Sequence, residues 1–69
     1  MKKGTILYFD PYKGFGKVIS SDGASYFIRL ESLRDQVQKG DEVEFSIQLN
    51  NQKPEAIKVR LINRPSTTN

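Results

Sequence analysis

Apolar and polar residues alternate along several short segments of the chain. The clearest segment is residues 43–49, where Val43, Phe45, Ile47 and Leu49 alternate with Glu44, Ser46 and Gln48. A strand places successive side chains on opposite faces, so this segment predicts a strand with one face in a core and the other in water. Residues 57–61 repeat the pattern, with Ile57, Val59 and Leu61 expected inside and Lys58 and Arg60 outside. Residues 4–9, 15–20 and 25–30 are rich in branched and aromatic residues and predict three more strands.

Turn signals separate these segments at short intervals. They are Asp10-Pro11, Asp22-Gly23, Gly40-Asp41 and Asn50-Asn51. Asp22-Gly23 is a favoured pair for a tight hairpin turn, so we expect strands 15–20 and 25–30 to be direct neighbours. Residues 31–34 have room for a single helical turn with Leu33 pointing inward, and no segment has the apolar period of a ten-residue helix. The pattern indicates a small antiparallel β protein.

Composition limits the chemistry that the chain can perform. A chain of 69 residues is one small domain, and it contains neither cysteine nor histidine. Disulfides, thiolate zinc sites and catalytic triads built on histidine are therefore excluded. The carboxylates lie near turns or at outward strand positions, where they read as solubilising charge. We predict no enzyme activity, no cofactor and no metal site. No apolar run approaches the length of a membrane span, and we expect a cytoplasmic protein.

The net charge of +3 is unevenly distributed. Basic residues predominate in residues 1–34 and again from residue 53 onward, whereas acidic residues predominate in residues 35–44. A cationic face and an acidic back would suit a polyanionic partner, and a solvated surface of mixed charge is the alternative.

Aromatic and basic side chains share one predicted face. Phe15 and Lys17 point the same way on one strand, as do Phe27 and Arg29 on its neighbour, so pairing of the strands would form one patch. Aromatic rings stack on any nucleobase, and cations at their edge contact phosphates. Both phenylalanines could instead be core residues. However, Val18, Ile28 and Leu30 already stand at the strand positions that are expected to face inward. The predicted nucleic-acid-binding residues are Tyr8, Phe15 and Phe27 for stacking, and Lys13, Lys17, Arg29, Lys58 and Arg60 for phosphate.

Five segments in order resemble a cold-shock domain. Residues 4–10 resemble the opening strand of that family, Lys13-Gly14-Phe15-Gly16 resembles the start of its first ribonucleoprotein motif, and residues 26–30 resemble its second. Residues 39–45 and residues 54–59 follow its last two strands. The resemblance implies an all-β fold, a five-stranded antiparallel Greek-key barrel of the oligonucleotide-binding type, over residues 1–62. We expect residues 63–69 to be a polar disordered tail or the start of a linker.

Family resemblance implies binding of single-stranded RNA or DNA with low sequence specificity, with RNA-chaperone activity, by a monomer. The sequence departs from the family pattern at several positions. Tyr8 stands in place of tryptophan, Lys17 in place of a second phenylalanine, Arg29 in place of histidine and Leu30 in place of an aromatic residue. Leu7, Asp10 and Ser25 also differ from the usual residues, and Tyr26 fills a normally small inward position. With fewer rings and more charge, we expect a weaker and more salt-sensitive binder than a typical member.

Two alternatives compete with this function. RNA-recognition domains share the first motif, but this chain lacks the periodicity for their two helices. The second alternative is a diverged barrel that acts as a protein-interaction or regulatory module of a larger protein. Loss of rings at Lys17 and Leu30 is what a change of partner would leave behind.

Overall fold

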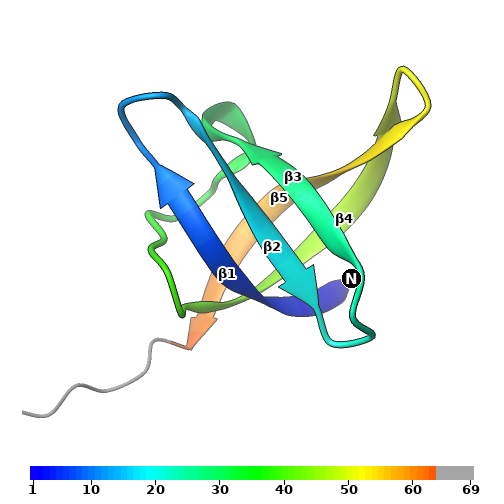
Figure 1. The fold of residues 1–69 in the computed structure, drawn as a ribbon. Helices are drawn as coiled ribbons and strands as arrows, with labels where there is room; N and C mark the ends of the chain where they lie inside the picture. Colours follow the sequence, from blue (N-terminus) through cyan, green and yellow to red (C-terminus); the bar gives the residue numbers. More distant parts are fainter. Residues whose placement is uncertain (64–69) are drawn as a thin grey trace, which may run out of the picture.

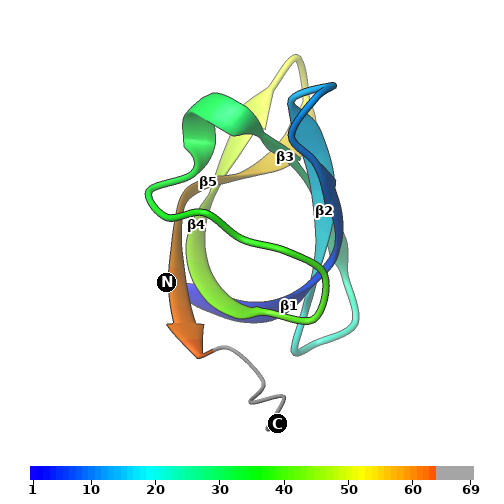
Figure 2. The same ribbon diagram turned by 90° about the vertical axis from the view of Figure 1, so that its left-hand side faces the viewer.

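The chain forms a five-stranded β-barrel. The computed structural model describes residues 1–63, which contain β1 (Lys2–Asp10), β2 (Phe15–Ser20), β3 (Ser25–Arg29), a 3-10 helix η1 (Leu30–Ser32), β4 (Glu42–Asn50) and β5 (Lys53–Asn63). The strands close in the order β1-β2-β3-β5-β4. Figure 1 shows β1, β2 and β3 lying side by side across one side of the barrel, and Figure 2 shows the strands closing into a ring.

One of the five strand pairings is parallel. β1 pairs with β2 and β4, β2 with β3, and β4 with β5, all in antiparallel orientation. The barrel is closed by β3 and β5, which run parallel and pair Phe27 with Glu55 and Ile28 with Ala56. The predicted all-β barrel of the oligonucleotide-binding type is confirmed.

The core lies inside the ring and receives side chains from every strand. Its fully buried apolar residues are Ile6, Val18, Ile28, Val43, Phe45, Ala56 and Val59. Tyr26 faces inward as predicted, with its ring centroid 5.8 Å from that of Phe45. Leu33 also packs against the core, as expected, although the helical turn begins one residue earlier than predicted, at Leu30.

Register shifts in β1 and β5 change the alternation of side chains along these strands. In β1, Ile6 pairs with Val18 and Tyr8 with Lys17, so Leu7 is an extra residue that forms a bulge. In β5, Glu44 pairs with Arg60 and Ser46 with Ile57, so Lys58 and Val59 together oppose one residue of β4. Lys58 has a φ of 54°, in the left-handed region. The prediction that Ile57 faces the core is wrong, because Ala56 is the buried residue at this point of the strand. The bulge then reverses the alternation, so Val59 is buried as predicted.

The hairpin of β4 and β5 extends beyond the ring (Figure 1, yellow). Leu49 pairs with Pro54 in this extension, and its side chain is 69% exposed. The expectation that Leu49 belongs to the core is wrong. The Leu49 side chain lies on the same face of β4 as the core residues Val43 and Phe45. The hairpin extends beyond the ring at this point, so no strand lies opposite Leu49 to cover it.

The segment between η1 and β4 crosses one end of the barrel (Figure 2, green). Asp41 at its end is fully buried and accepts a hydrogen bond from the Gln38 backbone N–H at 2.9 Å. The backbone of the segment is tied to β1 by bonds from the Ile6 N–H to the Asp41 carbonyl and from the Gly40 N–H to the Ile6 carbonyl. These bonds satisfy polar groups that would otherwise be buried without partners.

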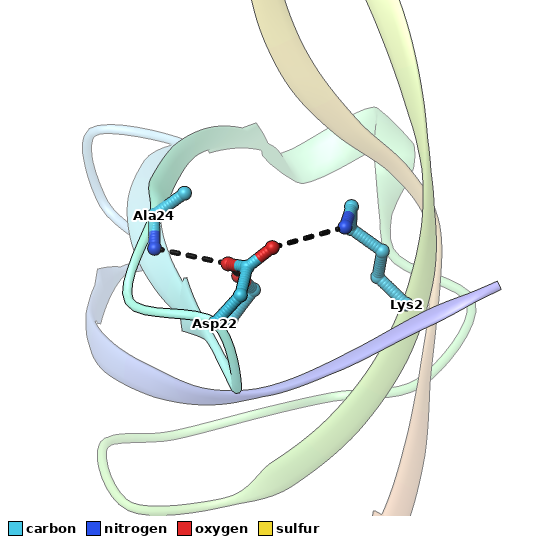
Figure 3. Close-up of polar contacts among 4 residues, drawn as sticks. Lys2, Asp22 and Ala24 are labelled. Atoms are coloured by element: carbon cyan, nitrogen blue, oxygen red, sulfur yellow. Dashed lines mark hydrogen bonds and ion pairs between the residues drawn. The ribbon is translucent and has the colours of Figure 1, made fainter.

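Asp22 organises the predicted hairpin turn between β2 and β3 (Figure 3). Its carboxylate accepts hydrogen bonds from the Ser20 hydroxyl and the Ala24 N–H, and it forms an ion pair with Lys2 at 3.2 Å. The Ser20 hydroxyl, the Ala24 N–H and Lys2, in that order, lower the pKa of Asp22 to about 2. Gly23 has a φ of 94°, which few other residues adopt.

The last two features of the fold concern membrane spans and the end of β5. None of the helices in residues 1–63 has the length and apolar character that crossing a membrane would require. Asn63 is the last residue of β5 and pairs with Glu42. The remaining residues of the predicted tail, 64–69, lie outside the described residues, so that prediction stays a prediction.

Candidate nucleic-acid interface

Strand register places the predicted rings and cations in two rows on the outer face of the barrel. Tyr8 pairs with Lys17, Lys17 with Phe27 and Phe27 with Glu55, which forms one row across four strands. In the next row Asp10 pairs with Phe15 and Phe15 with Arg29. We call the five residues Tyr8, Phe15, Lys17, Phe27 and Arg29 the outer-face ring cluster.

The two phenylalanines of this cluster stack on each other. Their ring centroids are 5.6 Å apart and their planes differ by 24°. Both rings are half-buried, and neither belongs to the core or packs against it. The prediction that they point away from the core is confirmed, whereas their mutual contact covers part of each ring. Tyr8 is 42% exposed, because the bulge at Leu7 turns it outward.

The turn between β1 and β2 is fixed by Asp10 and contains Lys13, two residues before Phe15. The Asp10 carboxylate accepts hydrogen bonds from the backbone N–H groups of Tyr12 at 2.9 Å and Lys13 at 3.3 Å. The Gly14 N–H donates to the Asp10 carbonyl, and the Gly14 carbonyl accepts from the Leu30 N–H. The second of these bonds holds the start of β2 against the end of β3, so Phe15 and Arg29 stay together.

A groove runs beside the cluster on the side of β5. It has a volume of about 470 Å³ and is lined by Lys17, Phe27, Arg29, Lys53, Pro54 and Glu55. The Arg29 guanidinium lies 5.9 Å from the centroid of the Phe27 ring, at cation–π range. Its Nε also donates to Glu55 at 3.4 Å, and the same carboxylate accepts from the Asn50 amide. Glu55 therefore neutralises part of the positive charge of the groove.

Lys58 and Arg60, two of the predicted phosphate contacts, do not line this groove. Arg60 points toward β4, where it forms an ion pair with Glu44 at 3.8 Å. Lys58 lines a separate groove beside η1. Both residues come after the part of β5 that pairs with β3, which ends at Ala56.

Sequence reasoning missed two exposed residues near the cluster. Lys53 lines the groove with Lys17. It stands two residues before Glu55, which pairs with Phe27, and this position in the sequence could have indicated it. Tyr12 is 98% exposed beside Lys13 in the β1–β2 turn. A fully exposed ring next to a cation has the same chemistry as the cluster. Among residues 1–63, no three side chains of Asp, Glu, His or Cys gather as a metal site would require.

Comparison with known proteins agrees with this architecture. Residues 2–62 match the family model described as the 'Cold-shock' DNA-binding domain. The chain is also 36% identical over 64 residues to "Cold shock domain-containing protein 4" of Arabidopsis thaliana. That alignment covers 84% of this chain and 32% of the plant protein, so the chain spans about a third of the length of this relative. The chain therefore belongs to the cold-shock domain family, which is a family of nucleic-acid-binding domains.

Proposed function

We propose that the chain binds single-stranded RNA or DNA with low sequence specificity, and that it acts as an RNA chaperone by keeping strands unpaired. The observation that carries the proposal is the outer-face ring cluster, in which Phe15 and Phe27 lie outside the core and are flanked by Tyr8, Lys17 and Arg29. Rings accept any base because every base has a π face, which gives affinity without sequence readout.

Stacking and charge have to act together in this interface. Three rings contribute roughly 3–9 kcal/mol before the cost of ordering the strand, at about 1–3 kcal/mol for each stacked base. Micromolar binding requires about 8 kcal/mol, so phosphate contacts from Lys13, Lys17, Arg29 and Lys53 must supply the remainder. We also propose that the chain is a monomer and that it acts in the cytoplasm.

The experiment replaces both stacking rings by a side chain of similar bulk. The double variant Phe15→Leu/Phe27→Leu keeps apolar surface and removes the π faces, so we expect affinity for a labelled pyrimidine-rich single strand to fall by at least about tenfold. Fluorescence anisotropy measures the affinity. Ile62→Ala is the matched control, since Ile62 is exposed and lies near the end of β5, away from the cluster. Equal affinities for wild type and the double variant would contradict the proposal.

One observation favours the alternative of a protein-interaction module. A groove of about 430 Å³ at the barrel end is lined mainly by apolar residues, namely Phe9, Pro11, Leu30, Leu33 and Val37, with Gln36 and Gln38. Leu30 is 50% exposed where it borders this groove. A protein that inserts an apolar side chain there would be insensitive to the Phe15→Leu/Phe27→Leu change and sensitive to Leu30→Asp, whereas the outer-face cluster predicts the reverse for an oligonucleotide.

A further inference from the structure

The groove beside η1 contains two cations that do not belong to the outer-face ring cluster. It has a volume of about 520 Å³ and is lined by Glu31, Ser32, Leu33, Arg34, Ile57 and Lys58. We call it the η1–β5 groove. We propose that it extends the path of a bound single strand beyond Arg29 and that Arg34 and Lys58 contact backbone phosphates there. This inference rests on the proposed function and concerns only strands long enough to leave the cluster.

The η1–β5 groove is contiguous with the cluster through the backbone. Phe27 and Ile28 of β3 pair in parallel with Glu55 and Ala56 of β5. Arg29 and Ile57 come next along these two strands. The groove is lined by Ile57 and Lys58 of β5 and by residues 31–34, which follow Arg29 closely. Because parallel strands advance in the same direction, a ligand that leaves Phe27 along them reaches both walls of the groove together.

The two cations of the groove are available for a ligand. Within residues 1–63, the side chains of Arg34 and Lys58 make no hydrogen bond and no ion pair. Arg29 and Arg60, by contrast, are paired with Glu55 and Glu44. Glu31 is the single acidic residue of the lining, so the groove keeps an excess of positive charge. Arg34 follows η1 and Lys58 lies in β5, so two different elements each supply one unpaired cation to the groove, and a backbone with repeated phosphates offers a charge to each of them.

Lys58 occupies a position where lysine is conformationally unfavourable. Its φ of 54° lies in the left-handed region, which asparagine and glycine tolerate far better than a long side chain does. The side chain is exposed, so packing does not require a lysine there. A strained residue that packing does not explain points to a function, and the ε-ammonium group is what asparagine would lack.

The test compares a short and a long single strand. We use pyrimidine oligonucleotides of about 4 and about 10 nucleotides. The first is about the smallest site size of this fold, and the second lies near the middle of its range. The variant Arg34→Gln/Lys58→Asn should leave binding of the short strand unchanged. For the long strand, the slope of log K against log salt should become shallower by about 1.4, because each lost phosphate contact removes about 0.7. Lys3→Gln/Lys39→Gln is the control of equal net charge, since neither lysine lines the groove.

A third variant tests the sign of the effect. Glu31→Gln removes the acidic group of the groove, so it should tighten binding of the long strand and leave the short strand unchanged. The single variant Lys58→Asn should not lower the midpoint of urea unfolding, because asparagine adopts the left-handed conformation at less cost than lysine does. A loss of binding by this variant would therefore not result from a loss of folding.

The outcomes distinguish the inference from the function on which it rests. If the groove variant binds both strands with wild-type salt slopes while Phe15→Leu/Phe27→Leu binds weakly, the inference is overturned and the proposed function stands. An equal loss in the Lys3→Gln/Lys39→Gln control also overturns it, because the effect would then be one of net charge. If the wild type binds neither strand, both proposals fail.

Discussion

Leu7 decides the direction of two aromatic side chains. As the extra residue of the β1 bulge, it places Tyr8 opposite Lys17 and lets Phe9 pack against the core. With regular alternation, Tyr8 would share the inward parity of Ile6 and leave the outer face. One residue without a pairing partner thus supplies the third ring of the cluster.

Asp22 provides a prediction about pH at the residue scale. Its pKa of about 2 in the folded chain is below the usual aspartate value, so its charged form is stabilised by folding. The stabilisation is fully present above the unfolded pKa, near 4, and is lost as the pH falls toward 2. We expect Asp22→Asn to lower the melting temperature at pH 7, and we expect this difference to shrink as the pH falls through about 2. Thermal melts followed by circular dichroism measure this, and a difference that is independent of pH would contradict it.

Parity in the sequence predicted the direction of Phe15 and Phe27 because their strands are regular. Val18 and Ile28 fix the inward face of β2 and β3, and no bulge intervenes. The same reasoning failed for Ile57, since the left-handed Lys58 reverses the alternation within β5. It also failed for Leu49, because parity gives the direction of a side chain and not whether another strand lies opposite it. Lys53 was missed for a related reason, since its neighbours come from the closure of β5 onto β3.

At the scale of the element, Gly16 sets how closely β1 and β2 approach. A Cβ at this position would contact the carbonyl oxygen of Tyr8 and lie 2.7 Å from the Cα of Phe9, which is closer than real Cβ contacts. Both neighbours are backbone atoms and cannot rotate away. The sharp curl of β1 over β2, which closes a barrel from so few strands, therefore requires glycine here.

Gly16→Ala provides the prediction for this element. The added methyl group forces the two strands apart, so we expect a loss of about 1–3 kcal/mol or more in the free energy of unfolding. Gly23→Ala is the matched control, because a Cβ there meets nothing within 4 Å and the cost comes only from its positive φ. That cost is about 1–2 kcal/mol. Urea unfolding measures both variants, and equal stability of Gly16→Ala and the wild type would refute the close approach of β1.

At the scale of the whole molecule, positive charge follows the outer face of β2, β3 and β5. Lys17, Arg29 and Lys53 surround Phe27, and Lys13 lies in the turn that leads into β2. Glu55 is the acidic residue that lines the same groove, and it is already engaged by Arg29 and Asn50. A bound phosphate would compete with Glu55 for Arg29, so binding costs part of an existing ion pair.

This arrangement predicts a strong dependence of binding on salt. If Lys13, Lys17, Arg29 and Lys53 each contact a phosphate, log K should fall against log salt with a slope of about −3, at roughly 0.7 for each contact to a single strand. Anisotropy titrations at several salt concentrations measure the slope, with a strand too short to reach Arg34 and Lys58. A dissociation constant that does not change with salt would show that these cations are not in the interface.

The position of β5 in the barrel has a consequence for synthesis. β5 pairs with β4 on one side and β3 on the other, so no closed ring exists until Lys53–Asn63 has been made. A chain emerging from the ribosome therefore carries four strands whose apolar faces stay open, and it can mature only when the last strand clears the exit tunnel. Arrest of translation before Lys53 should yield a nascent chain that proteases degrade, whereas arrest with β5 fully exposed should yield a protected one.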